Sequence, residues 1–160
     1  MFTWNDMITF VWAFFLTLPL VAFIHSAGHL FFALLFGGKA KVVLGQGRLL
    51  LSLGIFKMRM LYFVDCYSYY EGLKVNNRIT QTLVRAGGVI FNLLSIILVN
   101  SAISAGYLPK HMFFYQFVYF SVYYIFFDLL PTEYGEGQYS DGKAIWDIWK
   151  KGSEEKEKSR

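Results

Sequence analysis

The chain has 160 residues, of which 56% are hydrophobic and 20% aromatic, and its formal net charge is +4. A soluble domain of this size has too little interior for so much apolar surface, so the composition argues against a soluble protein and predicts a single membrane-embedded domain. One cysteine, Cys66, excludes an intrachain disulfide framework. The positive charge could suggest nucleic acid, but the positions of the charges indicate a membrane protein with no nucleic-acid partner.

Three apolar segments are long enough to cross the lipid bilayer, which takes about 20 helical residues. They are residues 7–36, 83–105 and 112–130. The first segment lacks a basic leading region and is too long for a signal peptide, so we expect a retained helix. Pro131 is expected to end the third helix. The predicted fold class is therefore a mainly α membrane protein with three transmembrane helices.

The basic residues divide unequally between the two sides of these spans. With three spans, the N-terminus and the loop at residues 106–111 share one side, which carries only Lys110. The first loop and the C-terminal segment share the other side and carry Lys39, Lys41, Arg48, Lys57, Arg59, Lys74, Arg78, Lys143, Lys150, Lys151, Lys156, Lys158 and Arg160. The positive-inside rule predicts a multi-pass integral membrane protein whose N-terminus lies outside and whose first loop and C-terminus are cytoplasmic.

The first loop carries strand signals. Gly37 and Gly38 end the first helix, as paired glycines often do. Residues 42–44 predict a short strand and residues 45–47 a turn, while residues 49–53 and 56–62 predict paired strands around Gly54. We therefore expect a small β-sheet at the cytoplasmic membrane surface, between the first two helices.

The C-terminal part is expected to contain a short interfacial helix and a tail. Residues 143–151 combine Ile and Trp with Lys, which is typical of a helix lying in the membrane surface. Residues 152–160 are strongly charged and predict a disordered tail. The domain therefore covers residues 1–151. Arg85, near the start of the second span, is expected to extend its charged end to the cytoplasmic surface.

His25 and His29 are the main functional candidates. Ionisable side chains inside a membrane are costly and usually face the protein interior. At positions i and i+4 the two imidazoles share one helix face and are close enough to bind one ion. The alternative is a pair of neutral histidines that only hydrogen-bond to neighbouring helices.

A zinc site would need a third protein ligand and would leave its fourth position for water. Asp141 follows the third span on the correct side of the membrane, in an Asp-Gly turn that can fold back towards the histidines. Asp128, one turn before Pro131, is the other acidic candidate.

Three motifs, in this order, resemble those of the site-2 protease family of intramembrane zinc metalloproteases. His-Ser-Ala-Gly-His at residues 25–29 resembles the His-Glu-x-x-His helix of the family. Ala-Gly-Gly-Val-Ile-Phe-Asn at residues 86–92 resembles its small-residue and Asn motif. Asp-Leu-Leu-Pro at residues 128–131, followed by Asp141-Gly142, resembles its Asn-x-x-Pro…Asp-Gly motif. With the loop strands, the resemblance covers roughly residues 7–150.

The resemblance implies a three-helix site-2-protease-like core that binds one zinc ion through His25, His29 and Asp141. It also implies cleavage of a membrane-embedded protein or peptide substrate, with an edge strand of the sheet pairing with the unwound substrate. Three residues would support the site: Asn92, Asp128 and Pro131.

The chain departs from the family pattern at three places. Ser26 occupies the position of the glutamate that acts as general base, and loss of such a base typically costs about 10²–10⁴ in rate. Asp128 replaces the usual asparagine. The interval between Pro131 and Asp141 is longer than in the family pattern and contains Glu133 and Glu136.

Three hypotheses follow from these departures. The first is a pseudoprotease that keeps the fold and the zinc, is impaired in hydrolysis, and binds a membrane-embedded client or regulates an active relative. The second is an active intramembrane zinc endopeptidase whose base has moved to Glu133, Glu136 or Asp128. The third is a metal-free structural membrane protein. Either a homo-oligomer or a hetero-oligomer is compatible with the sequence.

Overall fold

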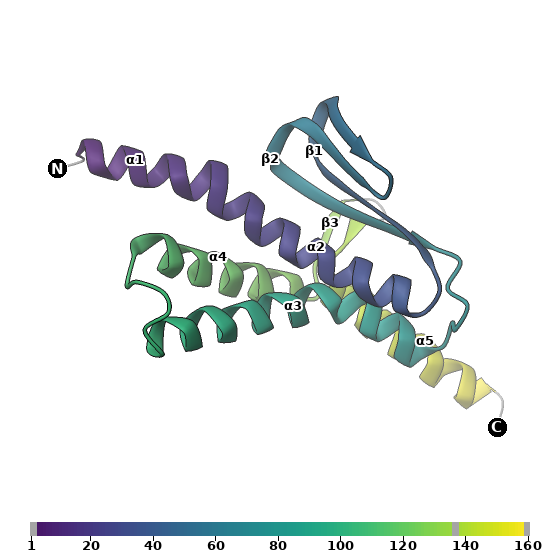
Figure 1. Ribbon diagram of the computed structural model, residues 1–160. Helices are drawn as coiled ribbons and strands as arrows, with labels where there is room; N and C mark the ends of the chain where they lie inside the picture. The colour runs from purple at the N-terminus through teal and green to yellow at the C-terminus, as the bar shows by residue number, and fades with distance from the viewer. Residues whose placement is uncertain (1–2, 136–137, 159–160) are drawn as a thin grey trace.

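The computed structural model describes residues 3–135 and 138–158 of the chain (Figure 1). The first span is formed by three consecutive helical segments, followed by a two-stranded sheet, two long helices, a short hairpin and a C-terminal helix. These elements are α1 (Trp4–Trp12), the π-helix η1 (Ala13–Thr17), α2 (Leu18–Leu35), β1 (Lys39–Leu53), β2 (Phe56–Glu71), α3 (Arg78–Ser104), α4 (Met112–Leu129), β3 (Glu133–Gly135), β4 (Gln138–Tyr139) and α5 (Asp141–Lys158).

The prediction of three membrane-spanning helices is confirmed. Three helical segments are long and apolar enough to cross a membrane: Trp4–Leu35, Arg78–Ser104 and Met112–Leu129. Many of their large apolar side chains are exposed, as expected of helices that face lipid; examples are Phe10, Leu98 and Phe126, which are 58%, 69% and 59% exposed.

Backbone contact between α2 and α3 forms the centre of the molecule. A Cβ atom at Gly28 would overlap the Gly87 carbonyl, and a Cβ atom at Gly87 would lie 2.6 Å from the Gly28 oxygen. Small residues let membrane helices approach this closely, and the gain is van der Waals packing rather than the hydrophobic effect. The two glycines therefore fix where α2 and α3 cross, beside His29.

The sheet predicted in the first loop is present and antiparallel, but its strands are longer than predicted. β1 continues through residues 45–47, where a turn was expected, because Gly45 and Gly47 adopt φ values of +83° and +88° and bend the strand without ending it. As a result, Met58 of β2 is paired with both Leu51 and Leu44. β2 also runs on to Glu71 and pairs with the start of β1.

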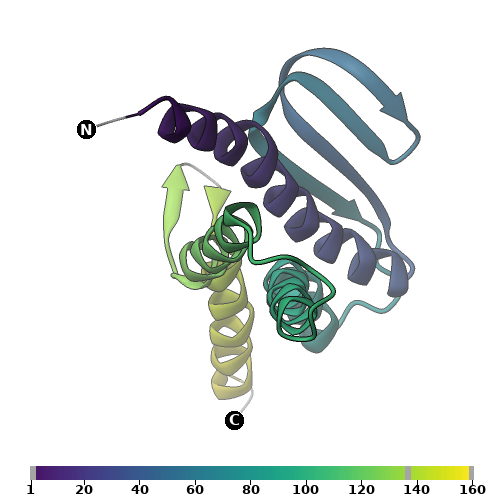
Figure 2. The ribbon, with the colours of Figure 1, turned by 60° about the vertical axis from the view of Figure 1, so that its left-hand side comes forward.

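The sheet extends along the first span, whereas the sequence placed it at the membrane surface. The Tyr62 hydroxyl donates to the Phe15 carbonyl at 3.2 Å, and the rings of Phe63 and Phe15 lie 4.8 Å apart. Phe15 belongs to the first half of the Trp4–Leu35 segment. Figures 1 and 2 both show the sheet on the opposite side of α1 and α2 from α3 and α4. The exposed hairpin residues Leu50 and Leu53 are apolar, which suits this position.

α5 is longer than the predicted interfacial helix at residues 143–151. It begins at Asp141, because the Ser140 hydroxyl accepts a hydrogen bond from the Lys143 amide at 3.1 Å and caps the first turn. It continues to Lys158, beyond the predicted end at residue 151, and the disorder expected of the tail at residues 152–160 stays a prediction. This stretch is rich in Glu and Lys, which are good helix formers. Residues 159–160 lie outside the described residues.

Candidate metal site

His25 and His29 lie side by side on the face of α2 that meets α3. Their Nε2 atoms are 3.1 Å apart. The Nδ1 atom of His29 lies 2.8 Å from the Val84 carbonyl oxygen. Because a carbonyl can only accept, Nδ1 carries the hydrogen, and in neutral His29 the Nε2 lone pair is available to a ligand. The one-turn spacing predicted from the sequence therefore produces a pair of inward-facing imidazoles.

α3 also builds the pocket of the His25 ring. A Cβ atom at Gly88 would overlap this ring, so the glycine makes room for it. The Asn92 side chain is fully buried, with its Nδ2 3.3 Å from His25 Nδ1, and its Oδ1 has no hydrogen-bond partner. Rotating the Asn92 amide by 180° would let its Oδ1 accept a hydrogen bond from His25 Nδ1–H. This satisfies the amide oxygen and leaves His25 Nε2 as the nitrogen with a free lone pair. Asn92, expected to support the site, does contact it.

Asp141 reaches the histidines from the far end of the chain. Its Oδ2 lies 3.0 Å from His29 Nε2, and its Oδ1 accepts from Arg85 Nη1 at 3.3 Å. Burial alone raises the pKa of the Asp141 carboxyl, but the adjacent Arg85 guanidinium and, when its ring is protonated, the hydrogen bond and charge of His29 outweigh burial and hold the pKa below its ordinary value. Asp141 is therefore ionised near neutral pH, as a metal ligand must be.

Contacts with the end of α4 position Asp141. The Asp128 Oδ1 atom accepts from the Asp141 amide at 3.2 Å. A Cβ atom at Gly142 would overlap the Leu129 carbonyl, so only glycine allows α5 to begin this close to α4. Pro131 is exposed and lies just after α4, where the chain leaves the helix. Asp128 therefore contacts Asp141 directly, whereas the supporting role of Pro131 stays a prediction.

The three side chains are close enough together to hold a metal ion. One ligand atom from each of His25, His29 and Asp141 lies within 4.8 Å of the others. Zinc bonds of about 2.0–2.2 Å in a tetrahedron place ligand atoms roughly 3.3–3.6 Å apart. The Nε2–Nε2 distance of 3.1 Å and the His29 Nε2–Asp141 Oδ2 distance of 3.0 Å are a few tenths of an ångström shorter than this, and the remaining pair, His25 and Asp141, has ligand atoms within 4.8 Å. A set of two histidines and one carboxylate leaves the fourth position open.

The candidate site opens into a cavity of about 750 Å³. Ser26, which is 2% exposed, lines this cavity together with the two histidines. Residues 66–69 of β2 also line it, so the sheet lies next to the site.

The three alternative bases have different surroundings. The Oδ2 atom of Asp128 is buried without a hydrogen-bond partner and lies 3.6 Å from His25 Nε2. Glu133 has a 57% exposed side chain and lies 3.7 Å from Lys143 Nζ. Glu136 lies outside the described residues. Among the candidates that the structure describes, Asp128 alone faces the histidines.

Two contacts of the site were missed from the sequence. Val84 contributes only a backbone carbonyl, for which no side-chain signal exists. Arg85 was expected to extend to the membrane surface, whereas its guanidinium contacts Asp141. The available signal was an arginine one residue before the small-residue motif of the second span.

Comparison with known proteins supports the membrane class. The chain is 47% identical over 152 residues to YwmF of Bacillus subtilis (strain 168), which is described as an uncharacterized membrane protein. The alignment covers 95% of this chain and 96% of the relative. No protein-family model and no solved structure matches the chain.

Proposed function

We propose that this chain, which belongs to the family of the membrane protein YwmF, is a zinc-binding membrane protein of site-2-protease type in which peptide hydrolysis is impaired. The observation that carries this proposal is the convergence of His25, His29 and Asp141, whose ligand atoms lie within 4.8 Å of one another. Two of these residues are one helical turn apart, whereas the third follows the last span.

Contacts within the protein orient these three side chains as ligands for a cation. The Val84 carbonyl fixes the tautomer of His29, Asn92 holds the His25 ring, and burial beside Arg85 keeps the Asp141 carboxylate in place. Such supporting hydrogen bonds orient metal ligands and raise their affinity. Zinc, when bound, would polarise a carbonyl group and lower the pKa of a coordinated water.

Ser26 is the reason to propose impaired hydrolysis. It lines the cavity beside the histidines, where a general base would have to accept a proton from water. A serine hydroxyl can position water but cannot take up a proton near neutral pH, and lack of a base costs about 10²–10⁴ in rate. The cavity would then hold a membrane-embedded client, with residues 66–69 of β2 offering backbone groups to an extended segment of that client.

We also propose that the N-terminus lies outside the cell and the first loop in the cytoplasm.

One observation favours an active enzyme as the second candidate. The Asp128 Oδ2 atom is buried without a hydrogen-bond partner, 3.6 Å from His25 Nε2. Asp128 of α4 therefore supplies a carboxylate near the histidines, where Ser26 of α2 has none. In that case Asp128 would accept the proton in place of the missing glutamate.

Metal content of the purified protein tests the zinc site. We expect about one zinc per chain in the wild type and none in His25→Ala or Asp141→Ala. His111→Ala is the matched control, because His111 caps the start of α4 at the other end of the third span. A wild type without zinc would instead support the metal-free structural protein.

Cleavage of a single-span substrate tests hydrolysis. We expect the wild type to be inactive and Ser26→Glu to gain activity. Activity in the wild type that disappears in Asp128→Asn would overturn the impaired enzyme and support the relocated base. Zinc content measured on the same samples separates loss of chemistry from loss of metal.

A further inference from the structure

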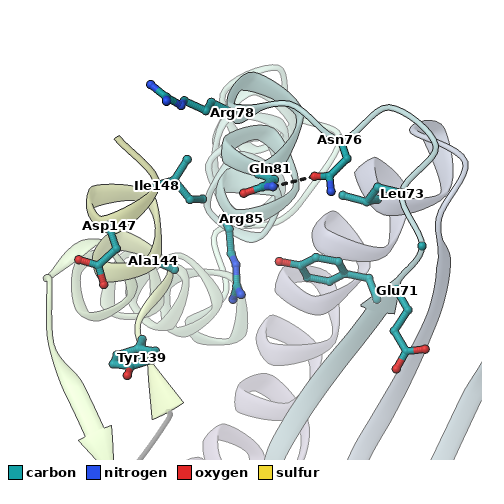
Figure 3. Close-up of a pocket in the computed structure, with 12 residues that line it drawn as sticks. Glu71, Leu73, Asn76, Arg78, Gln81, Arg85, Tyr139, Ala144, Asp147 and Ile148 are labelled. Atoms are coloured by element: carbon teal, nitrogen blue, oxygen red, sulfur yellow. Dashed lines mark hydrogen bonds between the residues drawn. The ribbon is translucent and has the colours of Figure 1, made fainter. Parts of the chain in front are cut away.

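Arg85 lies between two cavities near the start of α3. It lines the cavity of the metal site and also a second cavity of about 710 Å³, which is bounded by α3, α5 and the end of β2. Figure 3 shows Arg85 pointing from α3 into this second cavity, with Tyr139 and Ala144 on one side and Glu71 on the other. The Arg85 side chain is only 38% exposed, although the sequence predicted a surface position.

The guanidinium of Arg85 has two well-defined contacts. Its Nη1 donates to the Asp141 Oδ1 atom at 3.3 Å, and its Cζ lies 5.4 Å from the centre of the Tyr70 ring. A guanidinium is planar, permanently charged and suited both to carboxylates and to aromatic faces. Tyr70 therefore supports the group that holds Asp141.

The two oxygens of Asp141 have different partners. Oδ2 faces His29 Nε2 at 3.0 Å, whereas Oδ1 faces Arg85. Residue 84, directly before Arg85, holds the other side of the His29 ring through its carbonyl. Two consecutive residues of α3 therefore orient two of the three candidate ligands.

We propose that Arg85 is a positioning residue that restricts Asp141 to binding the metal through Oδ2 alone. This inference rests on the proposed zinc site. By occupying Oδ1, the guanidinium prevents the carboxylate from turning to bind the ion with both oxygens, so the fourth coordination position stays open.

Zinc affinity and the visible spectrum of cobalt-loaded protein test this role in detergent-purified full-length chain. We expect Arg85→Gln to weaken zinc binding by about 10–100-fold, as other supporting contacts of metal ligands do. We also expect its Co²⁺ absorption to weaken, because five-coordinate Co²⁺ absorbs less strongly than four-coordinate Co²⁺. Arg85→Lys keeps the charge but loses the planar fork, so an intermediate affinity is expected.

Arg78→Gln is the matched control, since Arg78 lies on the same helix and lines the same second cavity. We expect its zinc affinity and cobalt spectrum to equal those of the wild type. Tyr70→Leu should weaken zinc binding less than Arg85→Gln, and Tyr70→Phe, which loses the hydroxyl near Arg85 but keeps the ring beneath its guanidinium, should weaken it least. The Tyr70 variants also test the role if Arg85→Gln does not fold.

If Arg85→Gln has the zinc affinity and the cobalt spectrum of the wild type, the inference is overturned and the proposed zinc site is unaffected. If Arg85→Gln lowers thermal stability but leaves the cobalt spectrum unchanged, Arg85 has a structural role only, and the inference is also overturned. A wild type that binds neither metal would instead refute the zinc site itself.

Discussion

The two halves of the candidate site are built in different ways. His25 and His29 lie within one helix, and α3 supports both rings through Val84 and Asn92. Asp141 comes after the last span and is held by a few polar contacts to Asp128 and Arg85. The histidine half therefore depends on helix packing inside the membrane, whereas the aspartate half depends on where α5 begins. Mutations should affect the two halves differently.

The largest effect is expected for Gly87→Leu in the histidine half. Its side chain would collide with the Gly28 backbone, and neither helix can move away without breaking the α2–α3 contact. We expect a loss of stability beyond the about 1–3 kcal/mol typical of overpacking, with little folded protein recovered. Size-exclusion yield and thermal unfolding measure this. Ser101→Leu, at an exposed position of α3, is the control, and equal stability of the two variants would contradict the proposed packing.

A smaller effect is expected for Gly142→Val in the aspartate half. The added side chain would overlap the Leu129 carbonyl and displace the first turn of α5, which carries Asp141. We expect zinc binding to weaken by about 100-fold while the spans remain folded, measured by competition with a chelator and by circular dichroism. Lys150→Val, at an exposed position of the same helix, should bind zinc normally. Normal zinc binding by Gly142→Val would show that Asp141 is not a ligand.

Asn92→Leu should have a moderate effect that is confined to the metal. The change removes the contact with His25 but leaves the Gly28–Gly87 packing of α2 against α3 in place, so the spans should stay folded. We expect zinc affinity to fall by about 10–100-fold, measured by calorimetry. Asn100→Leu, at an exposed position of α3, should leave affinity unchanged. Equal affinities would mean that the amide does not orient His25.

The smallest effect is expected for Glu133→Gln. This exposed carboxylate lies next to Lys143, and such surface pairs contribute about 0–1 kcal/mol at most. Zinc content and any cleavage by the Ser26→Glu variant should stay within about two-fold. Loss of cleavage in the double variant would place the catalytic base in the loop after α4.

The sequence predicted the parts of this architecture that depend on local pattern. Three apolar segments predicted the spans, and the spacing of His25 and His29 predicted the imidazole pair. Asp141 was brought near them by topology, because it follows the third span on the correct side. These features need no knowledge of how the elements pack against one another.

Features that depend on packing could not be predicted. The glycines at residues 45–47 are equally compatible with a turn and with a bent strand, and only the pairing of Leu44 with Met58 shows which one forms. The contact between Arg85 and Asp141 requires α5 to pack beside α3, which no local pattern indicates. The contact of Tyr62 with Phe15, by which the sheet extends along the first span, likewise joins residues that no local pattern pairs.

The placement of Asp141 after the last span also sets an order of events during biosynthesis. The ribosome makes His25 and His29 first, and more than a hundred residues follow before the third candidate ligand is made. A chain still being translated thus offers the two imidazoles without the Asp141 carboxylate. Metal loading would then occur only after every span has entered the bilayer, so the ion would mark a completely inserted chain.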